Sequence, residues 1–318
     1  MAISNETFFI TGGAGFVGSN ITKLLIEKGA KIVVYDNLSS GRLDFLKTFK
    51  KNKNFEFIKA DLLDRETLEK SLQKSRPDTV VHLAANPDVR LGAKVTDLDL
   101  KQGTLATYNV LEACRKSDVK NLMFSSSSVV YGVAGLRPTP ESYGPLKPIS
   151  LYGASKLAGE ALISSFGSLF GIKYFIYRLA NVVGRNETHG IVVDFIKKLG
   201  KDSKNLEVLG NGKQKKSYID VEDCVEAMLY VYKNSKDSEN IFNLSTDDQM
   251  SVGDIASAVT DSVAPKARII YTGTEQGWPG DVPDTCLSNK KMKEFGVRLN
   301  YTKSKDAIIN AINVLKNP

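Results

Sequence analysis

Short runs of apolar and β-branched residues recur along the first 180 residues, separated by longer segments with helical spacing. The runs lie at residues 7–11, 31–35, 55–58, 79–83, 121–125 and 173–177. Between them, apolar side chains recur every three or four positions, as at Ile21, Leu24 and Leu25. Apolar strands that alternate with amphipathic helices are typical of a parallel sheet covered on both faces.

The regular alternation ends after residue 181. Gly, Asn and Lys become frequent there, the elements shorten, and an amphipathic helical pattern follows at residues 303–315. We therefore expect an α/β protein with a Rossmann-type doubly wound parallel sheet in residues 1–181. Residues 182–318 are expected to form a smaller mixed α/β substrate domain, with part of segment 219–248 returning to the first domain.

A glycine-rich loop follows the first predicted strand. Gly12, Gly15 and Gly18 are spaced as GxxGxxG, and Phe16 and Val17 open the helix that comes next. Such glycines permit a tight turn and let backbone N–H groups approach a pyrophosphate at the helix N-terminus. The loop alone is a weak signal, but its place between a strand and a helix predicts a dinucleotide site.

The second predicted strand runs into Asp36, 18 residues after Gly18, and Asn37 follows it. A carboxylate there accepts hydrogen bonds from the ribose hydroxyls of adenosine. It also repels a 2′-phosphate, so we expect NAD rather than NADP, with Asn37 in the same site. The alternative is that Asp36 only starts the turn in DNLSSG.

The ends of the third and fourth strands extend the expected cofactor site. Asp61 and Leu62 follow the third strand and would contact adenine, although Asp61 is also suited to capping the next helix. The fourth strand ends in residues that would let the cofactor lie close to the backbone: Leu83, Ala84 and Ala85.

Tyr152 and Lys156 lie one helical turn apart in SLYGASKLAGE, residues 150–160. They would therefore share a helix face. A nearby ammonium lowers the pKa of a phenol, which normally ionises near pH ~10, and such a pair can transfer protons. The spacing also arises by chance in many helices. A serine cluster, SSSSVVYG, follows the fifth strand, and a serine beside Tyr-x-x-x-Lys in a dinucleotide fold forms a catalytic pattern.

Together these motifs resemble the extended short-chain dehydrogenase/reductases, and among them the UDP-glucose 4-epimerase-like enzymes. The resemblance spans nearly the whole chain through TGGAGFVGSN, YDNLSSG, DLLD, HLAANPDVR, SSSSVVYG, YGASKLAGE and RLANVVG. It implies that Ser127, 25 residues before Tyr152, supplies the catalytic hydroxyl in preference to Ser126 and Ser128. It also implies that Lys156 holds the nicotinamide ribose and lowers the pKa of Tyr152.

The resemblance further implies a 4-epimerase of UDP-glucose and UDP-galactose. Tyr152 would remove the proton of the sugar 4-hydroxyl as hydride passes from C4 to NAD, with Ser127 bonded to the same oxygen. The 4-keto sugar would turn over, and hydride would return to its other face. Small residues at 153–155 would let the cofactor lie against this helix.

Substrate contacts are implied at six residues: Asn86, Ser127, Tyr152, Asn181, His189 and Lys216. Asn181 would contact the diphosphate, and His189 lies in a substrate loop, unless it is simply a solvated surface residue. Lys216 and Trp278 stand where related chains have diphosphate-binding arginines. Lysine keeps the charge but loses the bidentate fork, and the tryptophan could stack or merely pack.

Other reactions remain open within this family. The closest alternative is a UDP-uronic acid epimerase or decarboxylase, in which Arg90 or Arg185 would face the sugar carboxylate; another is a nucleotide-sugar dehydrogenase or reductase. A 4,6-dehydratase is disfavoured because Ser128 and Val129 stand in place of Asp-Glu. A non-catalytic regulator would be expected to lack Tyr152 or Lys156.

Composition narrows the class of protein. The net charge is +7, but the lysines are scattered, so a basic surface or an anionic substrate is favoured over nucleic acid. Three dispersed cysteines and two histidines predict neither disulfides nor a metal site. Without a signal peptide or membrane span we expect a cytoplasmic protein. By resemblance we expect a homodimer formed through helices at 97–116 and 150–170.

Overall fold

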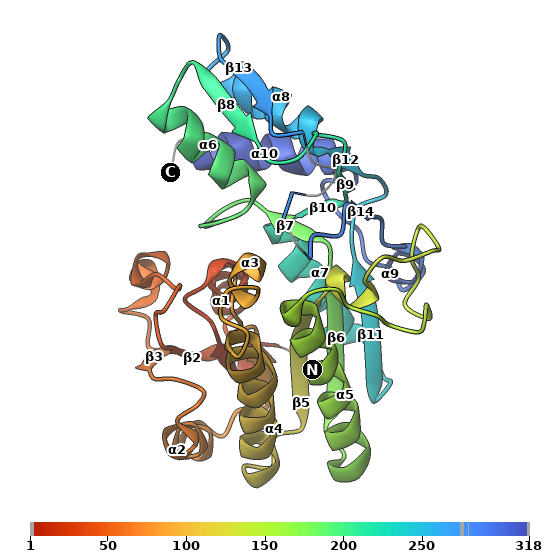
Figure 1. Ribbon diagram of the computed structural model, residues 1–318. Coiled ribbons are helices and arrows are strands. Elements are labelled where there is room, and N and C mark those ends of the chain that lie inside the picture. Colours follow the sequence, from red (N-terminus) through yellow and green to blue (C-terminus); the bar gives the residue numbers. More distant parts are fainter. Residues whose placement is uncertain (1–2, 274–276, 279, 317–318) are drawn as a thin grey trace. The chain divides into compact units, whose positions relative to one another are not determined.

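The computed structural model describes residues 3–273, 277–278 and 280–316, which form two compact units (Figure 1). The first unit holds the described residues up to 127, together with 151–178 and 228–242. The second holds residues 128–150 and 179–227 and the described residues from 243 onward. Segment 128–150, within the expected first domain, thus belongs to the second unit.

A seven-stranded sheet forms the centre of the first unit, in the order β11-β6-β5-β4-β1-β2-β3. β1 pairs in parallel with both β2 and β4, and the pairs β2–β3 and β4–β5 are also parallel. Every residue of β4 is buried, as its apolar sequence predicts for a strand covered on both faces. The strands are β1 (Thr7–Thr11), β2 (Lys31–Asp36), β3 (Phe55–Lys59), β4 (Thr79–His82), β5 (Asn121–Ser127), β6 (Lys173–Leu179) and β11 (Glu239–Leu244).

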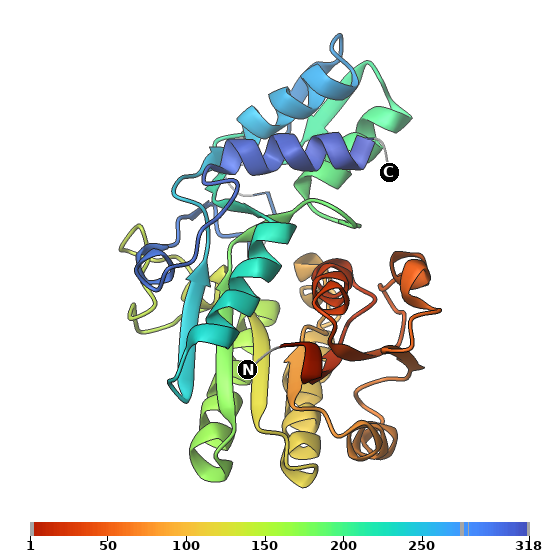
Figure 2. The ribbon, with the colours of Figure 1, turned by 180° about the vertical axis from the view of Figure 1, so that it is seen from behind.

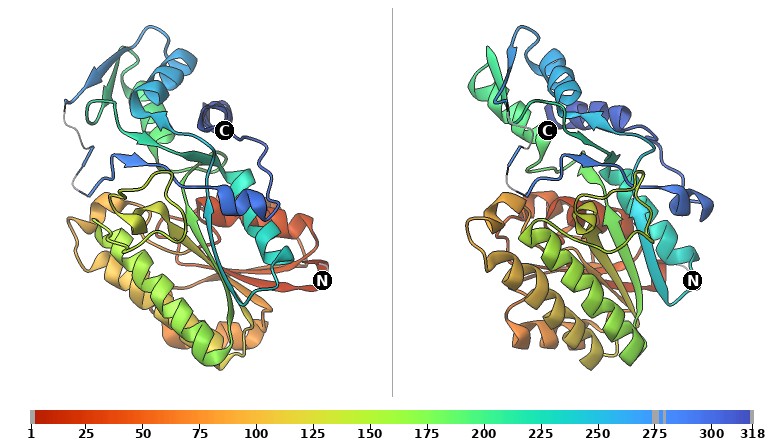
Figure 3. Two further views of the ribbon diagram at one scale, coloured as in Figure 1. Left: turned by 90° about the vertical axis from the view of Figure 1, so that its right-hand side faces the viewer. Right: turned by 45° about the vertical axis from the view of Figure 1, so that its right-hand side comes forward.

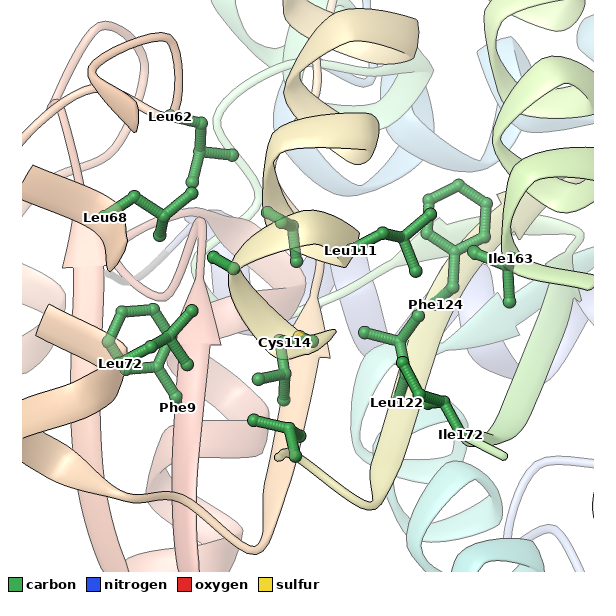
Figure 4. Close-up of a cluster of buried hydrophobic side chains, with 14 of the residues drawn as sticks. Phe9, Leu62, Leu68, Leu72, Leu111, Cys114, Leu122, Phe124, Ile163 and Ile172 are labelled. Atoms are coloured by element: carbon green, nitrogen blue, oxygen red, sulfur yellow. The ribbon is translucent and has the colours of Figure 1, made fainter. Parts of the chain in front are cut away.

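Helices cover both faces of this sheet. The helices assigned wholly to the first unit are α1 (Phe16–Glu27), α2 (Arg65–Ser75), α3 (Val89–Gly92), α4 (Ala106–Lys116) and α5 (Leu151–Phe170), with the shorter turns η1 (Ile3–Asn5) and η2 (Leu43–Phe49). Apolar side chains of α2, α4 and α5 pack on one face, where Leu72, Leu111 and Ile163 meet Phe9 and Phe124 (Figure 4). This cluster is the main core of the unit.

The opposite face is covered by α1 and by the part of α7 (Val221–Asn234) that begins at Met228 (Figure 2). Tyr232 on this segment makes edge-on ring contacts with Phe8 of β1 and Phe175 of β6. The Tyr177 hydroxyl donates to the Met228 carbonyl at 2.7 Å. The expected return of part of 219–248 thus has a counterpart at residues 228–242.

A π-helical turn, η3 (Leu100–Leu105), leads directly into α4. Such turns inside helices are uncommon and often lie at functional sites. A Cβ added to Gly103 would lie only 2.7 Å from the Ser155 Cβ, so η3 and α5 approach closely here. α4 and α5 run side by side over the sheet (Figure 3). The small residue at 155 therefore accommodates η3, whereas the sequence suggested room for a cofactor.

The second unit contains three small sheets, ordered β10-β7, β12-β9-β14 and β13-β8. Its strands are β7 (Asn181–Val183), β8 (Asn205–Val208), β9 (Lys215–Lys216), β10 (Tyr218–Asp220), β12 (Met250–Ser251), β13 (Arg268–Tyr271) and β14 (Asp284–Thr285). Its helices include η4 (Ser128–Tyr131), α6 (Ile191–Lys201), α8 (Val252–Val263), α9 (Lys290–Glu294) and α10 (Ser304–Lys316). α10 corresponds to the helix predicted at 303–315, and α6, α8 and α10 enclose a separate apolar core.

No helix in the described ranges has the length and apolar character needed to cross a membrane. Among the same residues, no group of three or more His, Cys, Asp and Glu side chains is arranged to hold a metal ion.

Candidate active site

The end of β5 and the start of α5 bring the three predicted catalytic side chains together. Ser127 is the last residue of β5, and its side chain is hydrogen-bonded to the phenol of Tyr152. Lys156 lies 5.7 Å from the Tyr152 ring centroid and 4.8 Å from that of Phe124. Its Nζ donates to the Ser125 carbonyl oxygen at 2.7 Å. The arrangement thus places a hydroxyl in contact with a phenol and an ammonium near the phenol ring, a set of groups suited to proton transfer.

Neighbouring serines of the SSSSVVYG motif have different hydrogen-bond partners. Ser126 donates to the buried carboxylate of Glu160, and Ser128 begins η4 in the second unit. Ser127 is the member of the cluster that is bonded to Tyr152. The hydroxyl that the resemblance selected is therefore the one next to the phenol.

Burial dominates the electrostatics of the pair. It raises the pKa of Tyr152 to about 12, and the carboxylate of Asp99 adds to this, while the bond to Ser127 acts in the opposite direction. Burial lowers the pKa of Lys156 to about 8, against the raising effects of Asp99 and Glu160. The expected low pKa of Tyr152 is thus wrong for the protein without ligands, because desolvation of the phenolate prevails.

The glycine loop is too tightly folded for side chains. Gly12 has a φ of +70°, and a Cβ there would lie 2.7 Å from the backbone nitrogen of Ala84. A Cβ on Gly18 would lie 2.1 Å from the Gly12 carbonyl oxygen. Gly15 caps α1 without a side-chain hydrogen bond. The first N–H groups of α1, beginning at Phe16 and Val17, therefore remain for an anionic ligand.

The Asp36 carboxylate stands at the end of β2 beside this loop, with 8% of its surface exposed. Its oxygens accept one hydrogen bond from Ala14 N at 3.0 Å and one from Leu38 N at 2.8 Å. A carboxylate has about four acceptor positions, so two remain for ligand hydroxyls. A Cβ on Gly41 would lie 2.9 Å from Oδ1, so this glycine keeps the carboxylate uncovered by a side chain. Asp36 therefore stabilises the turn that follows β2 and also keeps hydrogen-bond acceptor positions for a ligand.

Asn37 and Asp61 link the ends of β2 and β3, with 2.7 Å between Asn37 Nδ2 and Asp61 Oδ2. Asp64 caps α2 by accepting from Thr67 N, so the alternative role of Asp61 as the helix cap is wrong. Leu62, which directly follows Asp61 in the sequence, is buried. The two strand ends thus form a continuous edge beyond Asp36.

The family model described as the NAD dependent epimerase/dehydratase family matches residues 8–245. The chain belongs to this family. A putative UDP-glucose 4-epimerase of Methanocaldococcus jannaschii is 31% identical over 97% of this chain and 98% of its own. A crystal structure of a UDP-galactose 4-epimerase superposes with a TM-score of 0.86 at 37% identity, covering 98% of each chain. The Thermus thermophilus UDP-glucose 4-epimerase in complex with NAD gives a TM-score of 0.87 at 28% identity, over 98% and 99% of the two chains.

NAD is the cofactor of this epimerase/dehydratase, and the described residues fit it. The glycine turn carries no side chains and the start of α1 has no side-chain cap, so both can accept the pyrophosphate of NAD. The Asp36 carboxylate has acceptor positions left for the two ribose hydroxyls. The residues that would hold it are Gly12, Gly15, Phe16, Val17, Gly18, Asp36, Asn37, Asp61, Leu62, Leu83, Ala84, Ala85, Tyr152 and Lys156. When bound, NAD would supply the hydride acceptor for the reaction.

Two predicted substrate amides are already hydrogen-bonded within the chain. Asn86 Nδ2 donates to the Asp88 carbonyl at 2.9 Å and to Asp99 Oδ1 at 3.1 Å. Asn181 Nδ2 donates to the Ser217 carbonyl at 3.2 Å. Contact of either side chain with substrate stays a prediction, and so does that of His189, an exposed loop residue 2.9 Å from the Thr188 hydroxyl.

Lys216 and Trp278 form a cluster in the second unit with Asp281. The Lys216 ammonium lies 2.5 Å from Asp281 Oδ1 and 5.1 Å from the centroid of the Trp278 rings. The Trp278 Nε1 is buried and has no acceptor in the part of the chain that the structure describes. Of the two uses suggested for the tryptophan, stacking is the one observed, with the lysine as its partner.

Three buried charged or polar groups of the site escaped sequence reasoning. Asp99, in VTDLDLK, resembles a surface helix residue, and Glu160 resembles the polar face of α5. His82 is buried between Thr11 Oγ1 at 2.7 Å and Thr107 Oγ1 at 3.0 Å. Each partner lies far away in the sequence, so local pattern carries no signal for these contacts.

Proposed function

We propose that the protein is a UDP-hexose 4-epimerase that interconverts UDP-glucose and UDP-galactose through a 4-keto intermediate. The proposal rests above all on the hydrogen bond between Ser127 and Tyr152 with Lys156 alongside. The similarity to a UDP-galactose 4-epimerase at 37% identity supports this sugar pair.

In this proposal Tyr152 accepts the proton of the sugar 4-hydroxyl while C4 gives up hydride. Ser127 donates a hydrogen bond to the same oxygen and stabilises the negative charge that develops on it. Lys156 holds a positive charge near the phenolate, which favours its formation. After the 4-keto sugar has turned over, hydride returns to the opposite face of C4 and Tyr152 returns the proton to the oxygen. The reaction is therefore redox-neutral and consumes no second substrate.

Two arginines bear on the uronic acid alternative. Arg90 makes a bidentate contact with Asp88, with Nε–Oδ1 at 2.9 Å and Nη2–Oδ2 at 3.1 Å. Arg185 lies 3.6 Å from a Glu222 carboxylate oxygen. Both cations already have a carboxylate partner within the chain, which favours a neutral hexose over a sugar acid.

The decisive experiment is anion-exchange chromatography after incubation with UDP-glucose, UDP-galactose, their N-acetyl forms or UDP-glucuronate, without and with added NAD. Interconversion of UDP-glucose and UDP-galactose to equilibrium, with no net NADH, is the expected result. Tyr152→Phe should abolish it, whereas Tyr230→Phe, an exposed tyrosine, should not. Exclusive conversion of another sugar, loss of carbon dioxide, or accumulating NADH would replace the proposed reaction.

We also propose that the enzyme is a homodimer formed through α4 and α5. Large apolar side chains stay exposed on this part of the first unit at Leu100, Leu105, Leu169 and Phe170. Exposed apolar patches often mark association surfaces. Sedimentation equilibrium should give twice the 34.8 kDa chain mass, and Leu105→Glu should reduce it. A monomeric mass for the unaltered protein would refute the dimer.

A further inference from the structure

Asp99 places a buried carboxylate near the start of α5, the helix that carries Tyr152 and Lys156, from a distant part of the chain. It directly precedes η3, and only 1% of its surface is exposed. Its Oδ1 accepts from Asn86 Nδ2, whereas Oδ2 is buried and has no hydrogen-bond donor among the described residues. An unpartnered buried carboxylate oxygen is costly. Burial accordingly raises the pKa of Asp99, while the hydrogen bond from Asn86 and the positive charge of Lys156 act in the opposite direction.

A glycine makes room for this oxygen at the start of the catalytic helix. A Cβ on Gly92 would lie 2.3 Å from Asp99 Oδ2 and 3.5 Å from the Cβ of Leu151. Leu151 is the first residue of α5 and directly precedes Tyr152. Further along α5, Ser155 packs against Gly103 of η3. The segment that carries Asp99 is thus fixed against the same helical turn that carries the catalytic pair.

The charges around the pair single out Asp99. Its carboxylate raises the pKa of both Tyr152 and Lys156. Glu160 acts on Lys156 as well, but its own charge is matched by Arg178 of β6 at 2.7 Å. His82 faces Lys156 from β4 and is held uncharged by burial and by the lysine. Among the described groups around the pair, Asp99 is the one whose charge acts on both of its members.

We propose that Asp99 is a positioning residue whose carboxylate keeps the Lys156 ammonium charged at neutral pH and sets the pH at which Tyr152 becomes a base. The second part rests on the proposed function, because it concerns Tyr152 in turnover. The first part is a property of the protein without any substrate.

Asp99→Asn tests the proposal directly. The change removes the charge while an oxygen remains to accept from Asn86, and Oδ2 has no donor to lose, so folding should persist. Without the negative charge the ammonium is less favoured and the phenolate more favoured, so both pKa values must fall. Asp97→Asn is the matched control. It removes an exposed carboxylate that lies two residues before Asp99 and pairs with Lys101.

Carbon-13 NMR of lysine-labelled protein measures the first effect without cofactor or substrate. The Lys156 signal is assigned by its loss in Lys156→Arg. It should titrate near its value of about 8 in the unaltered protein and in Asp97→Asn. In Asp99→Asn we expect it about one unit lower. Equal Lys156 titrations in all three proteins would overturn the proposal.

The pH profile of turnover measures the second effect. In Asp99→Asn the whole profile should move to lower pH by about one unit with its maximum nearly retained. A purely structural residue would instead lower the maximum and the unfolding midpoint without moving the profile, and that result contradicts the proposal. If no UDP-sugar reacts, the proposed function is wrong. The NMR titration still tests the effect of Asp99 on the pKa of Lys156, because it needs no substrate.

A measurement on the unaltered protein covers the case in which Asp99→Asn does not fold. With carbon-13 aspartate, the Asp99 carboxyl signal should shift a second time as Lys156 loses its proton near pH 8. If the chemical shift of the Asp99 carboxyl carbon does not change over this pH range, the proposal is wrong.

Discussion

Glu160 and Arg178 form an ion pair, with 2.7 Å between Oε2 and Nη2, whose side chains are only 6% and 5% exposed. The pair joins α5 to β6, and Glu160 also accepts from Ser126. Both charged groups are shielded from water. If one partner is removed, the other stays buried with no opposite charge beside it.

Glu160→Gln should therefore lower the free energy of unfolding by about 3–5 kcal/mol. Urea denaturation followed by circular dichroism measures this change. Glu66→Gln breaks an exposed, solvent-screened pair with Lys70 and should change the free energy of unfolding far less than Glu160→Gln does. Similar losses in the two variants would show that burial of the Glu160 pair does not matter.

The buried imidazole of His82 should make the protein sensitive to acid. Burial lowers its pKa to about 3, from an ordinary 6.5. Between pH 6.5 and pH 3, His82 binds a proton in the unfolded chain but stays neutral in the folded protein. The free energy of unfolding therefore falls as the pH drops from 6.5 toward 3. The contribution is about 1.4 kcal/mol per pH unit.

Unfolding free energies between pH 7 and pH 4 test the role of His82 by comparison of variants. His82→Gln should reduce the pH slope, whereas His189→Asn, at the exposed second histidine, should leave it unchanged. An unaltered slope in His82→Gln would assign the acid sensitivity to carboxylates instead.

Asp36 should decide between NAD and NADP. Asp36→Ala removes the acceptor of the ribose hydroxyls. Loss of even one hydrogen bond to a charged acceptor costs about 1.5–3 kcal/mol, so NAD should bind at least about tenfold more weakly. NADP should lose less affinity, because repulsion of its 2′-phosphate disappears. Calorimetry on both nucleotides measures the ratio, with exposed Asp44→Ala as the control. An unchanged ratio would mean that Asp36 only shapes its turn.

Lys216 should bind the substrate diphosphate and play no part in NAD binding. Lys216→Met should weaken the binding of UDP by about tenfold or more, since one charge-assisted contact is lost. The neighbouring exposed Lys215→Met should bind UDP normally. Calorimetry with UDP and then NAD separates the two ligands. Normal UDP binding in Lys216→Met would assign the lysine to its contact with Asp281 alone.

The sheet was predictable because its strands are short, apolar and bounded by turn residues. All six strands predicted in the first 181 residues begin at the expected position. The first also ends where predicted, and the ends of the other five differ by one or two residues. β5 extends to Ser127 because serines continue the strand into the site. Tyr152 and Lys156 were recognisable by their helical spacing, and the serine cluster by its place at a strand end. The choice of Ser127 within that cluster came from the family resemblance.

The remaining parts of the site depend on contacts between distant segments. Nothing near Asp99 in the sequence shows that Gly92 leaves space for its carboxylate, or that Asn86 donates to it. The direction of the Tyr152 pKa was mispredicted for the same reason, since the depth of burial is a property of packing. The membership of segment 128–150 in the second unit was equally hidden, because it follows the catalytic strand directly.

The stacking of Lys216 on Trp278 gives the protein a natural optical probe. Trp278 is the sole tryptophan of the chain, so all indole fluorescence arises within reach of this ammonium. An anion that draws the lysine from the ring alters the field at the indole and hence its emission. Ligand arrival at this cluster can therefore be followed by stopped-flow, in real time and without a label.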